Sequence, residues 1–123
     1  MLICLDIDDT ITYAPEFFSR LTHTFADARI IVVTFRQDYD AAEQLLVELK
    51  VRFDQLIVST DPQQGKQPDQ PLHNWKADLI NTLRPQLFFE DMPEVVARVD
   101  DAICVMMPCD PTIRGWIANQ VGA

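Results

Sequence analysis

The sequence predicts an α/β protein in which helices cover both faces of a five-stranded parallel sheet. Short apolar runs, of the length of buried strands, alternate along the chain with segments of helical periodicity, and this alternation occurs five times. No internal repeat and no long linker divides the chain. The expected architecture is therefore a three-layer α/β/α domain that spans residues 1–123.

The first half of the chain alternates between strand and helix twice. The first strand is expected at 1–7, where MLICLDI forms a nearly continuous apolar run, as in strands buried on both faces. A helix over 16–27 follows, with apolar residues at helical spacing and Pro15 at a first-turn position. The run at 28–35 is rich in β-branched residues and predicts the second strand, and an apolar stripe predicts a helix over 38–50.

The second half continues the same order. A third strand is expected at 54–60, and the segment 61–71 is a loop because it has three prolines, one glycine and no periodicity. Helical spacing then predicts a helix over 73–84. The run QLFFED at 86–91 predicts the fourth strand, after which Pro93 opens a short helix.

The C-terminal part holds a fifth strand, expected at 102–107, and a last helix that begins near Thr112. Cys4 and Cys104 lie within apolar strands and are expected to be small core residues, as are the methionines that end the fifth strand. With Cys109 the cysteines are odd in number and have no CxxC spacing, so we expect free thiols and a reducing, cytoplasmic setting.

The charge balance restricts the possible partners. Ten basic residues face 19 acidic ones, for a net charge of −9. A broad nucleic-acid-binding surface needs an excess of Lys and Arg, so none is expected. No apolar stretch approaches the length of a membrane span.

Polar residues gather where the predicted strands end. In open α/β sheets, ligands bind at the carboxyl ends of the strands, near the point where the strand order reverses. The residues expected at this edge are Asp6, Asp8, Asp9, Thr10, Thr34, Phe35, Arg36, Glu90 and Asp91.

Such a cluster of carboxylates needs a counter-charge, and Mg²⁺ is a natural one because it takes oxygen ligands from carboxylates, water and phosphate. A carboxylate beside a polarised phosphorus can act as a nucleophile and give an aspartyl-phosphate. A second carboxyl two residues further on can serve as general acid and base. Thr34 and a lysine would hold the phosphoryl oxygens.

Four segments together resemble the haloacid dehalogenase-like (HAD) superfamily. LDIDDTIT (5–12) is similar to the first motif, DxDx(T/V) after a strand, and IIVVTF, ending in Thr34, is similar to the second. Lys76 is placed as the third-motif lysine, and LFFEDMPEVV (87–96) resembles the fourth motif, an acidic pair after a strand. The resemblance implies a Rossmann-like domain and Mg²⁺-dependent hydrolysis of phosphomonoesters through an aspartyl-phosphate.

The resemblance also implies roles for the acidic residues. Asp6 would be the nucleophile and a Mg²⁺ ligand, and Asp8 the general acid and base, which binds the metal through its backbone carbonyl. Asp91, supported by Glu90, would complete the metal site. Because the fourth motif reads Glu-Asp, the direct ligand is either of these two residues, with Asp91 favoured. Asp9 has no universal role in the family and is expected either to face solvent or to cap the following turn.

Thr34 and Lys76 would bind the transferred phosphoryl group. Lys66 in the loop competes with Lys76 for this role, but a lysine on a helix next to Trp75 suits a fixed position better.

Family members differ mostly in inserted cap domains, and neither insertion point here leaves room for one, so a capless member with an open site is expected. The chain also faintly resembles the phosphatase domain of polynucleotide kinases, in which an arginine after the second motif grips the substrate. Arg36 would be that residue, although it is equally placed to pair with Asp38 or Asp40.

The sequence is compatible with three functions to different degrees. The leading one is a Mg²⁺-dependent phosphatase whose substrate is a phosphorylated small molecule or an exposed phosphate on a larger one, with a homo-oligomer possible. The alternative is a weakly catalytic HAD-like domain that binds metal and phosphate and serves a protein partner. A response-regulator receiver is disfavoured because its phosphoacceptor aspartate would end the third strand, where the chain has Val58, Ser59 and Thr60.

Overall fold

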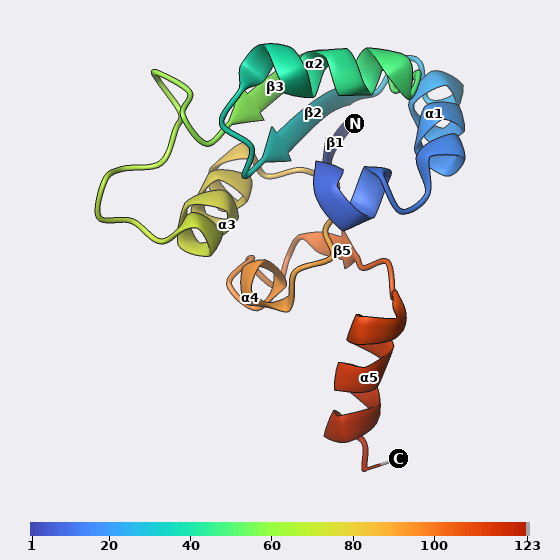
Figure 1. Cartoon of the computed structure of the whole chain (residues 1–123), viewed down its shortest axis with the longest axis vertical. Helices are drawn as coiled ribbons and strands as arrows, with labels where there is room; N and C mark the ends of the chain where they lie inside the picture. The colour runs from blue at the N-terminus through green and yellow to red at the C-terminus, as the bar shows by residue number, and fades with distance from the viewer. Residues whose placement is uncertain (123) are drawn as a thin grey trace.

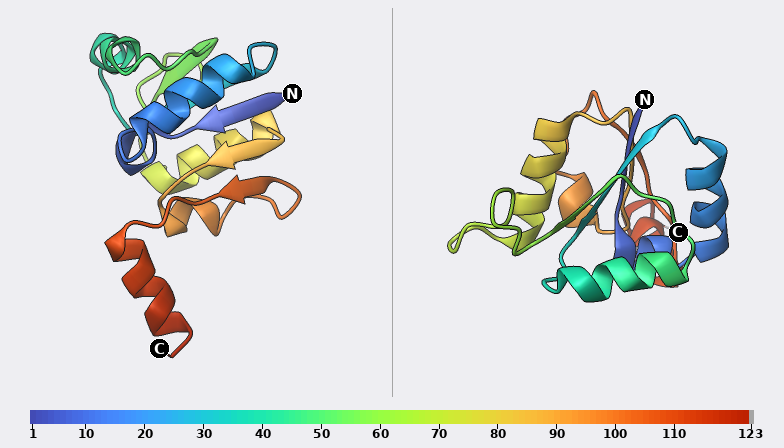
Figure 2. Two further views of the ribbon diagram at one scale, coloured as in Figure 1. Left: turned by 90° about the vertical axis from the view of Figure 1, so that its right-hand side faces the viewer. Right: turned by 90° about the horizontal axis from the view of Figure 1, so that it is seen from above.

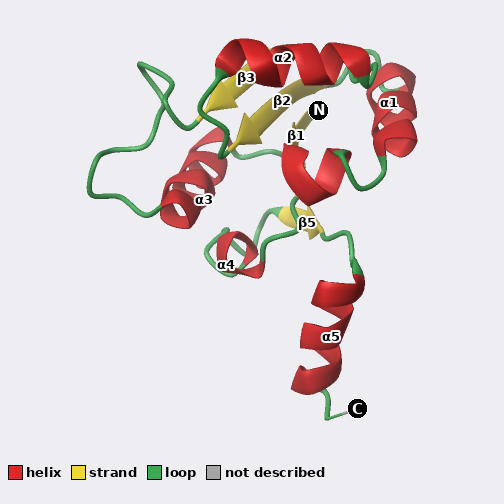
Figure 3. Ribbon diagram, viewed as in Figure 1, coloured by secondary structure: helices red, strands yellow, loops and turns green. Residues whose placement is uncertain are grey.

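A computed structural model describes residues 1–122 and has the predicted five-stranded, all-parallel sheet between helices (Figures 1 and 3). The strands lie in the order β3-β2-β1-β4-β5. Their bounds are β1 (Leu2–Leu5), β2 (Arg29–Thr34), β3 (Gln55–Val58), β4 (Leu87–Phe89) and β5 (Cys104–Met106). The helices are α1 (Pro15–Thr24), α2 (Tyr39–Glu48), α3 (Leu72–Leu83), α4 (Pro93–Val96) and α5 (Pro111–Gln120). Every predicted element is present, and most are shorter at their ends than expected.

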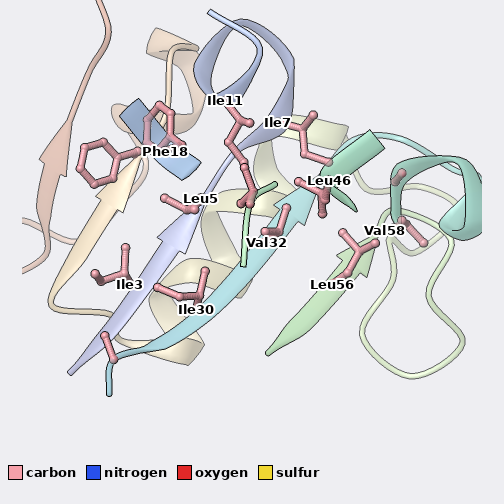
Figure 4. Close-up of a cluster of buried hydrophobic side chains, with 14 residues drawn as sticks. Ile3, Leu5, Ile7, Ile11, Phe18, Ile30, Val32, Leu46, Leu56 and Val58 are labelled. Carbon is pink, nitrogen blue, oxygen red and sulfur yellow. The ribbon is translucent and has the colours of Figure 1, made fainter. Parts of the chain in front are cut away.

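Two apolar layers sandwich the sheet, because successive side chains of a strand point to opposite faces. One layer joins Leu5 of β1 to Phe18 of α1 and Leu46 of α2 (Figure 4). The other joins Cys4 of β1 to Trp75 of α3 and to α4. Figure 2 shows the helices on the two sides of the sheet. Burial raises the pKa of the Cys4 thiol to about 12, so this thiol is an inert core group.

The strand order reverses between β1 and β4, which pair side by side in the middle of the sheet. The pairing continues past the strands, since the backbone N–H of Asp6 donates to the carbonyl of Phe89 over 3.1 Å. The residues that follow β1 and β4 are therefore held next to each other. This is the place where open α/β sheets bind ligands.

The loop between β3 and α3 is fixed at its base. The N–H of Gly65 donates to the carbonyl of Asp61 (2.9 Å), and the indole of Trp75 donates to the carbonyl of Gln64 (2.8 Å). The second bond ties the loop to the start of α3. A Cβ at Gly65 would lie only 2.3 Å from the carbonyl oxygen of Asp61, so the turn requires glycine.

The predicted burial is wrong for two residues of β5. Cys104 and Met106 were expected in the core, but both are exposed. They lie on the face that α1 and α2 cover elsewhere, as their register with Leu87 and Phe89 shows. α5 follows β5 but projects away from the sheet, so it leaves this face of β5 uncovered (Figures 1 and 2). Among the described residues, none of the helices has the length and hydropathy needed to cross a bilayer.

Replacing Gly65 with alanine is expected to lower the free energy of unfolding by about 1–3 kcal/mol, because the new methyl group meets backbone atoms that hold the turn. Gly115→Ala in α5 adds the same methyl group without a clash, since a Cβ there meets nothing within 4 Å, and because alanine is the better helix former it should raise the free energy of unfolding by up to about 1 kcal/mol. Urea denaturation followed by circular dichroism gives both values. Equal midpoints for Gly65→Ala and the wild type would contradict the prediction.

Candidate functional site

The turn after β1 separates the three aspartates of LDIDDTIT. Asp6 and Asp8 are extended, with φ/ψ of −85°/153° and −71°/127°, whereas Asp9 is left-handed with φ 61°. Aspartate tolerates this conformation better than most residues. Asp6 is buried, whereas Asp8 and Asp9 are exposed. The backbone N–H of Asp9 donates to the hydroxyl of Thr12. The turn thus gives the first two aspartates different environments and leaves Asp9 apart from them.

Lys76 is the central cation of the site. Its ammonium is fully buried and lies 2.5 Å from Oδ1 of Asp6 and 2.8 Å from Oε1 of Glu90. It also lies 4.7 Å from the centre of the Phe35 ring. Burial alone would lower the pKa of Lys76, but the two carboxylates hold that pKa above its usual value. Lys76 is therefore charged, and it is shared between the strand ends of β1 and β4.

Lys66, the competing lysine, is not part of this cluster. Its ammonium donates to the carbonyl of Gln67 over 2.9 Å within the loop. Of the two lysines considered from the sequence, the structure brings Lys76 to Asp6.

Glu90 and Asp91 differ in burial and in their contacts although they are adjacent. Oε2 of Glu90 accepts the backbone N–H groups of Asp91 (3.0 Å) and Met92 (3.1 Å), and Glu90 is almost fully buried. Its other oxygen faces Lys76, without a hydrogen bond of good geometry. Asp91 is partly exposed. Glu90 thus closes the base of the cluster, and Asp91 lies at its opening.

Asp6, Glu90 and Asp91 each place a carboxylate oxygen within 4.8 Å of the other two. The hydroxyl of Thr10 donates to Oδ2 of Asp6 (2.8 Å) and lies 3.4 Å from Oδ1 of Asp91. Burial, together with the neighbouring Asp6 and Glu90, raises the pKa of Asp91 to about 8. One lysine does not balance three carboxylates, and an all-oxygen donor set short of positive charge suits a hard divalent cation such as Mg²⁺.

Asp8 forms a two-point ion pair with Arg36, with distances of 2.8 Å from Nη2 to Oδ1 and 3.0 Å from Nε to Oδ2. The guanidinium lowers the pKa of Asp8, mainly through these hydrogen bonds. The structure thus pairs Arg36 with Asp8 and not with Asp38 or Asp40. Asp38 instead caps α2 by accepting the N–H of Ala41. The pair is partly exposed to solvent.

Thr34 ends β2 with its side chain buried, and its hydroxyl accepts the N–H of Arg36 over 3.1 Å. The structure thus connects Thr34 to Arg36 rather than directly to Asp6. Ser59 holds the same turn from β3, because its N–H donates to the carbonyl of Arg36 over 3.0 Å. Both contacts fix the start of the segment that carries the arginine.

Three residues have contacts that the sequence analysis did not predict. Thr10 bridges Asp6 and Asp91, Phe35 covers Lys76, and Ser59 supports Arg36. Thr10 and Phe35 were placed at the strand ends without a role. For Thr10 a signal was present, since it is the last position of the DxDx(T/V) motif, but nothing marked Ser59 as more than a strand-end serine.

Lys76→Met is expected to lower the free energy of unfolding by about 3–5 kcal/mol, because it leaves two buried carboxylates without their cation. Adding Glu90→Gln should recover part of this loss. Lys66→Met is the control and should change the value by less than about 0.5 kcal/mol. Chemical denaturation measures all three. A loss no larger for Lys76→Met than for Lys66→Met would show that Lys76 does not carry the cluster.

The raised pKa of Asp91 predicts how pH and Mg²⁺ act on stability. Without a divalent cation, the folded chain holds a proton up to about pH 8 that the unfolded chain releases near 3.8, so this group makes stability fall as pH rises between these values. A cation that replaces the proton should stabilise the fold more at higher pH.

The measurement is the melting temperature in Mg²⁺ minus that in EDTA, from about pH 5 to about pH 9. We expect the difference to grow with pH in the wild type and to be small and flat in Asp91→Asn. Asp101→Asn, which removes an exposed carboxylate elsewhere, should behave like the wild type. If the difference in melting temperature of the wild type becomes smaller as pH rises, the prediction is wrong.

Comparison with known proteins identifies a similar fold but no family. No family model matches the chain, and no curated protein matches it. Among solved structures, it is similar to a chain of the Pnkp1/Rnl/Hen1 RNA repair complex, with a TM-score of 0.67 and 12% sequence identity. The match covers 87% of this chain and 42% of that one. At this identity the likeness shows a shared α/β fold alone.

Proposed function

We propose that this chain is a HAD-like, Mg²⁺-dependent phosphomonoesterase that works through an aspartyl-phosphate on Asp6. The observation that carries the proposal is the contrast between two neighbouring carboxylates at the reversal point of the sheet. Asp6 is buried against a lysine and two further acids, whereas Asp8, two residues further along the chain, is exposed. A nucleophile and a general acid have different tasks and need different environments.

Asp6 would act first. One of its carboxylate oxygens forms a bond to phosphorus as the ester oxygen leaves, and Asp8 gives a proton to that leaving oxygen. In the second step Asp8 takes a proton from water, the water oxygen bonds to phosphorus, and the bond to Asp6 breaks to release inorganic phosphate. Lys76 and Thr10 hold the Asp6 carboxylate in place through both steps.

The acids at the cluster fit a Mg²⁺ ion, which would be held by Asp6, Asp91 and the backbone carbonyl of Asp8. When bound, the ion would offset the negative charge of the carboxylates and of the phosphate. Glu90 suits an inward role, because one oxygen accepts two backbone N–H groups and the other faces Lys76. The more exposed Asp91 suits the direct contact.

Arg36 gives Asp8 a way to change its protonation state. An acid must carry a proton, yet the ion pair with Arg36 keeps the pKa of Asp8 low. A substrate phosphate dianion competes with Asp8 for the guanidinium, and once Arg36 turns to the phosphate the cause of the low pKa is gone. Substrate arrival and readiness of the acid are thereby linked. Thr34 and Lys76 complete the phosphoryl site in this proposal.

The open site admits more than small molecules. No extra domain lies after β1 or after β3 in the described part of the chain. The likeness to a chain from an RNA repair complex makes terminal phosphates of oligonucleotides one class to test. The net charge of −9 argues against a long nucleic-acid track, so such a substrate would be held mainly by its terminal phosphate.

Turnover of para-nitrophenyl phosphate in Mg²⁺ and in EDTA tests the reaction. We expect Mg²⁺-dependent turnover in the wild type and none above background in Asp6→Asn. Asp8→Asn should lower kcat by about 10²–10⁴ for alkyl phosphates, and less for para-nitrophenyl phosphate, whose leaving group needs little protonation. Asp9→Asn is the matched control, since Asp9 lies outside the cluster and Asn also tolerates its backbone conformation.

A wild-type rate that equals the Asp6→Asn rate would favour the alternative, a HAD-like domain that binds metal and phosphate for a protein partner. Trapping with beryllofluoride or vanadate then separates binding from chemistry. The adduct should form on Asp6, and an adduct on another carboxylate would overturn the assignment of the nucleophile.

A further inference from the structure

Helix α5 carries an apolar stripe that its own chain does not cover. Ile113, Trp116, Ile117 and Val121 have the spacing of one helix face, yet only Ile113 is buried. The helix projects from the body (Figures 1 and 2). A ten-residue helix with a glycine in its interior is marginal in water without packing. The helix would therefore be stabilised if its stripe packed against another apolar surface.

The body of the same chain has an incompletely covered apolar surface, which we call the β5 patch: Tyr13, Phe17, Met106 and Met107, with the buried Phe89 beneath them. These residues line a pocket of about 250 Å³ between α1 and the end of β5. Tyr13, Phe17 and Met106 are each about half exposed. Strands of parallel sheets are normally covered on both faces, so the patch also lacks a partner.

A short hinge between β5 and α5 leads into the projecting helix (Figures 1 and 2). Pro108 and Pro111 restrict the backbone of this short segment. Asp110 caps the helix by accepting the N–H of Ile113 (2.8 Å), and Arg114 donates through Nε to the carbonyl of Cys109 (2.8 Å). These contacts join the first turn of α5 to the hinge residues that precede it.

We propose that two copies of the chain pair by exchanging their C-terminal helices, with the stripe of each α5 lying in the β5 patch of the other. A two-fold pair makes this contact twice and covers both surfaces at once. Charge is compatible with this occupant. Arg114 is the only ionisable side chain within α5 and offsets Asp110 at its N-cap, so the docked helix adds no net negative charge to a chain that carries −9.

Sedimentation equilibrium of the full chain from about 1 to about 100 μM tests the pairing. The wild type should reach twice the 14.1 kDa of one chain. Trp116→Glu in the stripe, and Met106→Glu or Tyr13→Glu in the patch, should each weaken the dimer at least about tenfold. Val47→Glu is the control: Val47 is 65% exposed on α2, away from both surfaces, and its replacement should leave the dimer intact.

Mixing the variants identifies what the helix contacts. Trp116→Glu and Met106→Glu are each expected to be monomeric alone, but a mixture contains one intact helix and one intact patch and should form a heterodimer. Circular dichroism shows that each variant is folded, and Tyr13→Glu replaces Met106→Glu if the latter is not. A patch variant that still forms homodimers would mean that the helices pair with each other, which overturns the proposal.

Trp116 provides a second readout. It is 50% exposed, whereas Trp75 is 3% exposed and hydrogen-bonded, so a concentration-dependent emission shift reports on Trp116. We expect emission at shorter wavelength as the dimer forms. A wild type that stays monomeric throughout the concentration range, with unchanged emission, would also overturn the proposal.

Discussion

The buried ammonium of Lys76 is the interaction on which the rest of this structure depends. It faces carboxylates that follow two different strands, Asp6 after β1 and Glu90 after β4, and it reaches them from α3 on one side of the sheet. Without it, the reversal point would hold several acids and no cation in a poorly solvated place. A buried charge is tolerated only when it is paired and hydrogen-bonded, so the lysine and the acids must be retained together.

One cation nevertheless leaves the cluster short of positive charge, and the shortage falls on Asp91. Burial, together with the neighbouring Asp6 and Glu90, which already share Lys76, raises the pKa of Asp91 to about 8, so Asp91 holds a proton to unusually high pH. The outer pair of Asp8 and Arg36 is balanced by comparison, and it faces solvent. The inner part of the site therefore has an excess of negative charge, whereas the charges of the outer ion pair cancel until an anion competes for Arg36.

The sequence predicts the sheet and the convergence of Asp6, Lys76, Glu90 and Asp91, because apolar runs mark strands and parallel strands end at one edge. It did not predict that Arg36 would pair with Asp8. That contact joins the turns that follow β1 and β2, and no pattern of residue types specifies the backbone path of these turns. The exposure of β5 was missed for a different reason. An apolar strand shows that a covering layer is needed, but not whether the helix that follows lies over it.

The loop after β3 is anchored at its base, so its tip can vary in length. Gly65 and Trp75 fix the two sides of this loop, so the position of Lys76 does not depend on the exposed residues 67–69 between them. Exposed loop tips of this kind accept inserted segments. An extra module could therefore be grafted at this tip, close to the carboxyl edge of the sheet, without displacing the lysine. A small uncapped domain would thereby acquire a lid, and with it a new preference among substrates.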